Sequence, residues 1–367
     1  MKTLTLRQKI AYMLMPSFRY WHYSTSEDIV DGQVSLSMLE DCVRRNLFGG
    51  LILFEANVPD RQSASDLVHR LQKANAEGGA EEQLLIAIDQ EGGRVSRLPF
   101  GTPVPFCRDI ADTGDIENAR QAGHIIAADL STVGINLDFA PVMDVDSNPD
   151  NPVIGQRSYS CNPLTVASFG RAFIEGLHEG GVLASLKHFP GHGDTTVDSH
   201  IGLPLVDKSL QELLGCEIIP FKRNLEIADT IMTAHIQFPQ IEKQTVVSRL
   251  TGKHITLPAT LSKTILTDLL RDRLGYRGVI ITDDLCMGAI AKHFAVLDSA
   301  KLAINAGADI LLMPVDLATA AGVESAEKLI DGLVYCVEKG NIDEKRVDEA
   351  VMRIHTLKGR LPDRRNR

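Results

Sequence analysis

The sequence has no surplus of positive charge, and this absence excludes two classes of partner. Its 367 residues include 38 Lys and Arg against 48 Asp and Glu, a formal net charge of -10. A protein that binds nucleic acid needs a basic face to neutralise phosphates, and anionic membrane surfaces attract basic segments. We therefore expect no nucleic-acid partner and no membrane partner, and a small substrate that is neutral or held by local charges.

Long apolar runs and closely spaced cysteines are also missing. No stretch approaches the ~18 apolar residues of a membrane-spanning helix, and residues 1–9 lack the apolar core of a signal peptide. The cysteines are scattered without a CxxC pair: Cys42, Cys107, Cys161, Cys216, Cys286 and Cys336. Such spacing favours reduced thiols over disulfides or a zinc site. We predict a cytoplasmic protein, while the oligomeric state stays open.

Eight short apolar segments are present instead. They are Ala11–Met15, Gly50–Phe54, Leu84–Ile88, Ile135–Val142, Leu183–Leu186, Thr230–Ala234, Val279–Ile281 and Asp309–Met313. Apolar runs without alternation are typical of strands buried on both faces. Helical periodicity marks the stretches between them, among them Asp66–Asn75, Ile116–Val133, Leu164–Glu179 and Ser262–Leu274.

Strand and helix in alternation indicate βαβ units, and eight repeats favour a closed TIM (β/α)8 barrel of the α/β class. An open doubly wound sheet is the rival fold. No Pro-rich or Ser-rich linker separates a second domain, so we predict one catalytic domain over residues 1–367. Apolar residues at helical spacing predict a closing helix at about 343–360.

Charged clusters directly follow four of the apolar segments. They begin at Asp89, Lys187, His235 and Asp283. In a barrel, chemistry lies at the C-terminal ends of the strands. Charged groups at the end of a buried strand are costly unless they are paired or face a cleft. Four clusters from separate strands therefore indicate convergence on one site.

A metal site is one interpretation of the second cluster. His188, His192, Asp194, Asp198 and His200 are all ligand types. The glycines and the proline between them exclude the helix of an HxxxH zinc site, and no other Cys or His cluster completes a shell. We expect no metal and no cofactor. A purely structural loop is the other alternative, although turn formation explains its dense charge poorly.

Glycoside hydrolysis suits these residues better. It needs a carboxylate against the anomeric carbon and a group that donates and then removes a proton. Asp283, fixed at a strand end, is the candidate nucleophile, and Lys187 or Arg97 could keep it ionised. A His paired with an Asp can transfer the proton. Asp198 and His200 point alike on an extended loop, a spacing that incidental surface pairs share.

Several motifs together resemble family 3 β-N-acetylhexosaminidases over about Leu4 to Leu361. They are Gly49–Phe54, Asp89–Arg94, Asp138–Asp144, Gly155–Tyr159, Lys187–Asp194 with Asp198–His200, and Gly278–Leu285. The resemblance implies that Asp283 is the nucleophile, and that His200 is the acid/base with Asp198 as its partner. It implies that the sugar in the −1 subsite is held by Asp89, Arg97, Arg157, Lys187 and His188.

Other residues in these motifs are given supporting roles. We expect Asp144 to brace the site from below. His192, Asp194 and His235 lie in matching motifs, and we assign none of them to direct substrate contact. Arg157 has an alternative interpretation as an ion-pair partner that holds its loop. Cys286 stands where the family usually has Ser or Glu, and we expect it to face packing.

The resemblance implies a retaining exo-β-N-acetylglucosaminidase that acts on a small carbohydrate such as GlcNAc-MurNAc or a muropeptide, without a cofactor. A β-glucosidase of the same family is less favoured, because many take their acid/base from a second domain and lack the Asp-x-His loop. A glycoside phosphorylase stays open, since a His acid/base does not repel phosphate. A non-enzymatic sugar-binding barrel would have lost the nucleophile or the Asp198–His200 pair, and both are present in the sequence.

Overall fold

Parallel strands built from the predicted apolar runs form the central sheet. The computed structural model describes all residues except 1–3, 20, 22–32, 197, 200–201 and 363–367. In this described part, eight strands pair in the order β11-β8-β7-β6-β3-β2-β1-β12. They are β1 (Leu14–Ser17), β2 (Gly50–Ile52), β3 (Leu85–Ile88), β6 (Leu137–Asp138), β7 (Leu183–Phe189), β8 (Thr230–Thr233), β11 (Val279–Ile281) and β12 (Leu311–Asp316).

The sheet closes on itself, which confirms the barrel. A parallel bridge joins Ile281, the last residue of β11, to Ile310, directly before β12. The N–H of Thr282 donates to the carbonyl of Ile310 at 3.0 Å. An open doubly wound sheet would leave two free edges, so that rival interpretation is wrong. Every residue of β3 is buried with 0% exposure, as strands covered on both faces require.

The strand limits differ from the prediction at the N-terminus, where part of the predicted strand is a helix. The run Ala11–Met15 was expected to be a strand, but Ala11 and Tyr12 end helix α1 (Leu6–Tyr12) and β1 begins at Leu14. A capping box explains the error: Thr5 accepts from the N–H of Gln8, whose side chain accepts from the N–H of Thr5. That local signal starts a helix, and burial alone does not separate a helix end from a strand.

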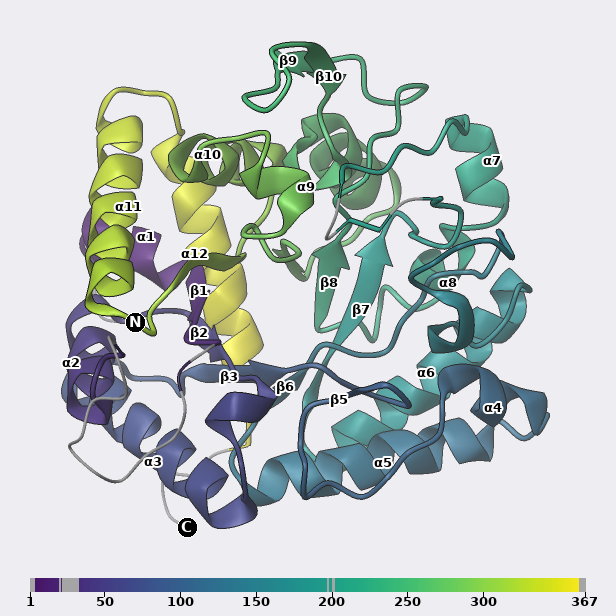
Figure 1. The fold of residues 1–367 in the computed structure, drawn as a ribbon, viewed down its shortest axis with the longest axis horizontal. Coiled ribbons are helices and arrows are strands. Elements are labelled where there is room, and N and C mark those ends of the chain that lie inside the picture. Colours follow the sequence, from purple (N-terminus) through teal and green to yellow (C-terminus); the bar gives the residue numbers. More distant parts are fainter. Residues whose placement is uncertain (1–3, 20, 22–32, 197, 200–201, 363–367) are drawn as a thin grey trace.

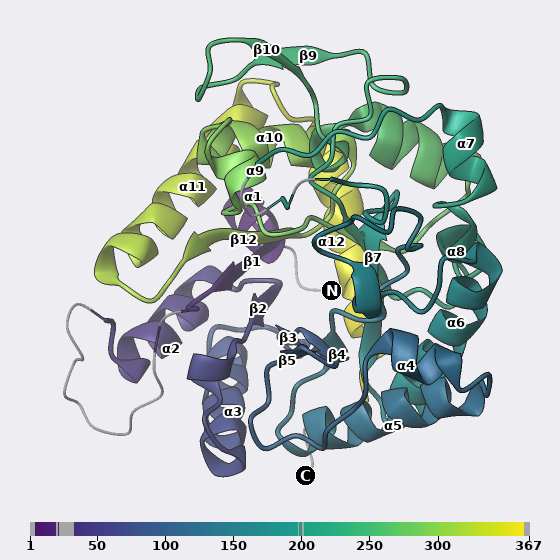
Figure 2. The same cartoon turned by 45° about the vertical axis from the view of Figure 1, so that its right-hand side comes forward.

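Helices surround the barrel and cover the outer face of the sheet (Figure 1; Figure 2). They are α2 (Leu36–Asn46), α3 (Arg61–Glu77), α4 (Cys107–Asp112), α5 (Glu117–Thr132), α6 (Pro163–Glu179), α7 (Leu210–Gly215), α8 (Ile219–Lys222), the π-helix η4 (Thr264–Arg273), α9 (Gly288–Ala291), α10 (Val296–Ala306), α11 (Ala320–Glu338) and α12 (Glu344–Lys358). The predicted helices correspond to α3, α5, α6, η4 and α12. Among the described helices, we find none long and apolar enough to cross a membrane.

Among the residues that the structure describes, two hairpins lie outside the barrel sheet. One pairs β4 (Gln90–Gly92) with β5 (Val95–Ser96), directly after β3. The other pairs β9 (Thr245–Val247) with β10 (His254–Thr256) and projects beyond the barrel in both views (Figure 1; Figure 2).

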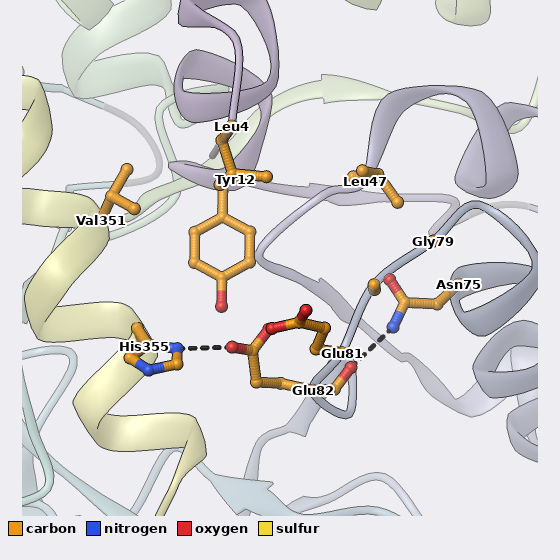
Figure 3. A pocket seen from close by; sticks show the side chains of 10 residues that line it. Leu4, Tyr12, Leu47, Asn75, Gly79, Glu81, Glu82, Val351 and His355 are labelled. Carbon is orange, nitrogen blue, oxygen red and sulfur yellow. Dashed lines mark hydrogen bonds and ion pairs between the residues drawn. The ribbon is translucent and has the colours of Figure 1, made fainter. Parts of the chain in front are cut away.

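A small pocket lies at the N-terminal ends of the strands, where Tyr12 and Glu82 precede β1 and β3. An ion pair between His355 and Glu82 ties α12 to the segment before β3. The Tyr12 hydroxyl is buried and points toward the side chains of Glu81 and Glu82 (Figure 3). Lys358 is 4% exposed, and its Nζ lies 4.2 Å from the centroid of the Tyr12 ring. These contacts hold the closing helix against the base of the barrel.

Lys358→Met is expected to stabilise the protein. Burial lowers the pKa of Lys358 from 10.5 to about 7, so the unfolded chain binds more protons than the folded one between these values. The free energy of unfolding should therefore rise from pH 7 to pH 10 in the parent protein. The variant should lose this slope and gain about 2 kcal/mol at pH 7, measured by urea unfolding at several pH values.

Lys328→Met is the matched control, because Lys328 lies on α11 with its side chain 73% exposed. It should change the free energy of unfolding by less than about 0.5 kcal/mol. The opposite result would be a lower free energy of unfolding for Lys358→Met, with the same dependence on pH as in the parent protein. It would show that Lys358 is charged in the folded protein and that its contact with the Tyr12 ring is stabilising.

Candidate active site

A cleft opens at the C-terminal ends of the barrel strands. It encloses about 840 Å³ of space that is open to solvent. All eight strands, or the loops that follow them, contribute to its lining, as the convergence of charged strand ends predicted. The lining residues are Arg19, Ile52, Phe54, Asp89, Glu91, Val95, Arg97, Val153, Arg157, Lys187, His188, His192, Ser199, Met232, Asp283, Asp284, Met287, Leu312 and Met313. Six of the eight predicted site residues are among them.

A buried network of charges forms one wall of the cleft. Lys187, 1% exposed at the end of β7, donates from Nζ to Asp89 Oδ1 at 2.7 Å and lies 2.6 Å from Glu91 Oε1. Arg157 donates from Nε and Nη2 to the two oxygens of Glu91 at 2.9 and 2.8 Å. The ion pair suggested as an alternative for Arg157 is therefore present, and the same side chain also lines the cleft.

Glu91 is the centre of this network, and the sequence interpretation passed over it. Burial acts to raise the pKa of Glu91, but the cations of Arg157 and Lys187 hold it well below its ordinary value. One signal could have found it. Asp89 and Glu91 are two residues apart, so an extended chain turns both toward the same side.

Glu91→Gln should destabilise the protein and reduce its turnover. The amide preserves the shape of Glu91 but removes the negative charge that pairs with the buried cations of Arg157 and Lys187. Removing one partner of a buried ion pair typically costs about 3–5 kcal/mol. Urea unfolding measures this loss, and substrate affinity should fall as Arg157 and Lys187 move.

Glu324→Gln removes an ion pair of the same type, with Lys328, at a side chain that is 65% exposed. It should cost less than about 0.5 kcal/mol. Equal losses for the two variants would mean that the Glu91 network adds nothing beyond a surface pair.

Asp283 faces this network from the end of β11. Its N–H donates to Thr233 Oγ1 at 3.3 Å, and its Oδ1 accepts from the N–H of Asp284 at 2.7 Å. Burial acts to raise the pKa of Asp283, but the neighbouring His235 and His188 side chains lower it overall. The carboxylate is thus held ionised and in a fixed orientation. Lys187 contributes to the lower pKa as expected, whereas the larger contribution of His235 was not foreseen.

Asp284 and Cys286, which follow Asp283 by one and three residues, have different roles in the loop. Asp284 also lines the cleft, and its Oδ1 accepts from the N–H of Cys286 at 2.7 Å. This turn directs Cys286 outward, so the expectation that it faces packing is wrong. Cys286 is exposed, and its Sγ donates to the carbonyl of Met313 at 3.0 Å.

Asp144 lies beneath the site, where the sequence placed a bracing group. Its Oδ2 lies 2.7 Å from Nδ1 of His188, and its Oδ1 accepts from the N–H groups of His188 and His192 at 3.2 and 2.6 Å. Asp144 is fully buried. Burial acts to raise its pKa, but His188 and His192 lower it overall. These contacts fix the orientation of His188 at the cleft.

The loop after β7 is held close to the preceding loop. A Cβ on Gly193 would lie 1.6 Å from the carbonyl oxygen of Val145, so only glycine permits this approach. His192 hydrogen-bonds Thr195 Oγ1 at 2.9 Å, and burial lowers the pKa of His192 to about 4. It is therefore neutral near pH 7 and organises the loop. Asp194 is ion-paired with Lys208 at 3.0 Å.

The predicted proton-transfer pair is described only in part. His200 lies outside the described residues. Asp198 is described but does not line the cleft, while its neighbour Ser199 does. The carbonyl of Ser199 accepts from the N–H of Ala289 in α9 at 3.1 Å. This contact brings the loop to the edge of the cleft near β11, the strand that carries Asp283.

Arg97 reaches the cleft from the strand-end hairpin β4–β5. Its N–H donates to Gln90 Oε1 at 2.7 Å, while its buried side-chain Nε has no hydrogen-bond partner among the described residues. In the same part of the chain, no group of three or more His, Cys, Asp or Glu side chains is arranged to hold a metal ion.

Comparison with known proteins identifies relatives over almost the whole chain. Residues 5–357 match the family described as the glycosyl hydrolase family 3 N terminal domain. The chain is 37% identical to beta-hexosaminidase A of Pseudoalteromonas piscicida, over 98% of this chain and 62% of that protein. It spans about three fifths of the length of that relative.

Solved structures agree with the sequence match. A glycoside hydrolase family 3 beta-N-acetylglucosaminidase from Paenibacillus sp. str. FPU-7 superposes with a TM-score of 0.85 at 38% identity, over 98% of this chain and 63% of that one. A beta-N-acetylhexosaminidase from Beutenbergia cavernae superposes with a TM-score of 0.81 at 28% identity, over 97% of this chain and 99% of that one.

Proposed function

Since this chain belongs to glycoside hydrolase family 3, we propose that it is a retaining exo-β-N-acetylglucosaminidase. The proposed substrates are GlcNAc-MurNAc and related muropeptides, released in cell-wall turnover and recycled in the cytoplasm. The names of the relatives support the hexosaminidase activity. The proposal also treats the barrel as one catalytic domain that carries every group the reaction needs.

One observation carries the proposal: an ionised, oriented carboxylate faces a buried set of polar anchors across a sugar-sized cleft. Asp283 is fixed by two hydrogen bonds at the end of β11. Opposite it, Lys187 and Asp89 present charged groups that can bind sugar hydroxyls. This is the arrangement needed for a nucleophile against an anomeric carbon.

Apolar side chains in the cleft favour an N-acetylated sugar over a plain hexose. Those that line it include Ile52, Met232, Met287, Leu312 and Met313. A glucoside lacks the acetamido methyl group that an N-acetylglucosaminide can place against these side chains. Burying one methyl group is worth roughly 0.8 kcal/mol, a preference that adds to hydrogen bonds with the amide.

The proposed reaction is a double displacement. Asp283 attacks the anomeric carbon while His200, charged and oriented by Asp198, protonates the departing oxygen. A glycosyl ester on Asp283 forms. His200 then removes a proton from water, which attacks the same carbon and releases GlcNAc. Two inversions at one carbon retain the anomeric configuration.

Hydrolysis of p-nitrophenyl N-acetyl-β-glucosaminide tests the activity, with the β-glucoside as the comparison substrate. We expect turnover of the first and little of the second. Proton NMR of the first-formed sugar should show the β anomer. Phosphate at millimolar concentration should leave the rate unchanged and give no sugar 1-phosphate; if that product forms, the enzyme is a phosphorylase.

A further inference from the structure

A buried threonine beneath the cleft forms the centre of a hydrogen-bond network behind the proposed nucleophile. Thr260 lies in the short helix η3 (Ala259–Leu261), and its N–H donates to the carbonyl of Ala234 at 3.2 Å. Its hydroxyl donates to the same carbonyl at 3.0 Å, and its Oγ1 lies 2.8 Å from both Thr233 Oγ1 and His235 Nδ1. A hydroxyl has one proton and two lone pairs, so these three contacts use its full hydrogen-bonding capacity.

One side of this network reaches the backbone N–H of the nucleophile. Thr233 Oγ1 accepts from the N–H of Asp283 at 3.3 Å. Strands β8 and β11 pair in parallel with Met232 opposite Ile281, so Thr233 lies where the chain leaves β11 toward Asp283. The contact with Thr260 opposes rotation of the Thr233 hydroxyl away from this N–H.

The other side reaches the residue after the nucleophile. His235 Nε2 lies 2.8 Å from the carbonyl oxygen of Asp284. A carbonyl oxygen can only accept, so Nε2 carries a proton and donates it. The N–H of Asp284 in turn donates to Asp283 Oδ1 at 2.7 Å. The residue that orients the carboxylate is therefore itself held by His235.

Burial makes this network rigid. Thr233, His235 and Thr260 are each 0% exposed. Hydrogen bonds in such an environment are stronger than in water, and a network whose groups are all satisfied fixes a single arrangement. At the cleft surface above these side chains, the carboxylate of Asp283 is the group that the network holds. Such precision matters for rate, because a 1 Å misplacement of a reacting group can cost on the order of 10²-fold.

We propose that Thr260 is a positioning residue for the nucleophile, whose hydroxyl holds Thr233 and His235 and through them the backbone on both sides of the Asp283 side chain. The assignment rests on the proposed glycosidase function, in which Asp283 attacks the anomeric carbon. It adds the residue that keeps this carboxylate in line for the attack. Thr260 acts through Asp283, without contact to the sugar and without transferring a proton.

Thr260→Val tests the assignment, because it removes the hydroxyl and keeps the shape of the side chain. We expect kcat to fall about 10- to 100-fold, while the inhibition constant of the product GlcNAc changes less than about 2-fold, since sugar binding does not depend on the line of attack. The value of kcat/KM should fall by the same factor for p-nitrophenyl and dinitrophenyl N-acetyl-β-glucosaminides, because Asp283 attacks in the first step whatever the leaving group. Thr260→Ser restores the hydroxyl and should stay within about 3-fold of the parent.

Thr245→Val is the matched control, because the exposed Thr245 makes the same type of contact, from Oγ1 to Nδ1 of His254 at 3.3 Å. It should change neither kcat nor the inhibition constant. The assignment is overturned if Thr260→Val keeps its kcat, or if Thr260→Ser loses as much as Thr260→Val. A loss confined to the poorer leaving group also overturns it, since Thr260 would then act on proton transfer.

Should Thr260→Val not fold, Thr233→Val carries the same test, because it removes the acceptor of the Asp283 N–H. The same loss of kcat is expected, with Thr233→Ser as the variant that restores it. The parent protein separates failure of this assignment from failure of the proposed function. If it does not hydrolyse p-nitrophenyl N-acetyl-β-glucosaminide, the proposed function itself is contradicted.

Discussion

Asp283→Asn is expected to lower kcat by on the order of 10⁴-fold or more, the scale of loss when a covalent nucleophile is removed. The amide keeps the shape of the side chain, and its oxygen can still accept from the N–H of Asp284, as the carboxylate does at 2.7 Å. It cannot form the glycosyl ester. Folding and sugar binding should therefore persist, and steady-state kinetics with thermal unfolding measure both.

Asp284→Asn provides the comparison for this variant. Its side-chain oxygen caps the turn at Cys286, a role that an asparagine can also fill. We expect a loss of less than about 10-fold. The reverse order, with Asp283→Asn active and Asp284→Asn inactive, would move the nucleophile to Asp284.

His200→Ala should slow the cleavage of GlcNAc-MurNAc by on the order of 10²–10⁴-fold, because a poor leaving group depends on general acid help. A dinitrophenyl leaving group departs unaided, so the first step should stay fast with that substrate. The second step still needs a general base. A burst of phenol and an accumulated glycosyl ester on Asp283 should therefore appear, detected by stopped-flow absorbance and by intact mass.

Asp198→Asn should give the same pattern more mildly, because Asp198 orients and charges the imidazole without moving the proton. Equal losses for good and poor leaving groups would show that His200 is not the acid/base. His192 would be a poor replacement, since its pKa is lowered to about 4. Asp194 would have to leave its ion pair with Lys208.

The sequence by itself determined most of the barrel strands and the charged residues that follow them. A buried parallel strand is an uninterrupted apolar run, and a charged residue at its end is visible because it breaks that run. Asp283 after β11 and Lys187 at the end of β7 are examples, and both line one cleft. Their convergence follows from the barrel, in which all strand ends meet at one face.

Only the tertiary structure decided which charges neutralise one another. Arg157 pairs with Glu91, 66 residues earlier in the chain, because β3 and β6 are neighbours in the barrel and carry their loops together. His235 lowers the pKa of Asp283 because β8 pairs with β11. The guanidinium carbon of Arg19, after β1, likewise lies 4.7 Å from the centroid of the Phe54 ring, after β2, because these two strands pair. Burial and Coulomb energies act through space, and the distances that set them exist only after the sheet has closed.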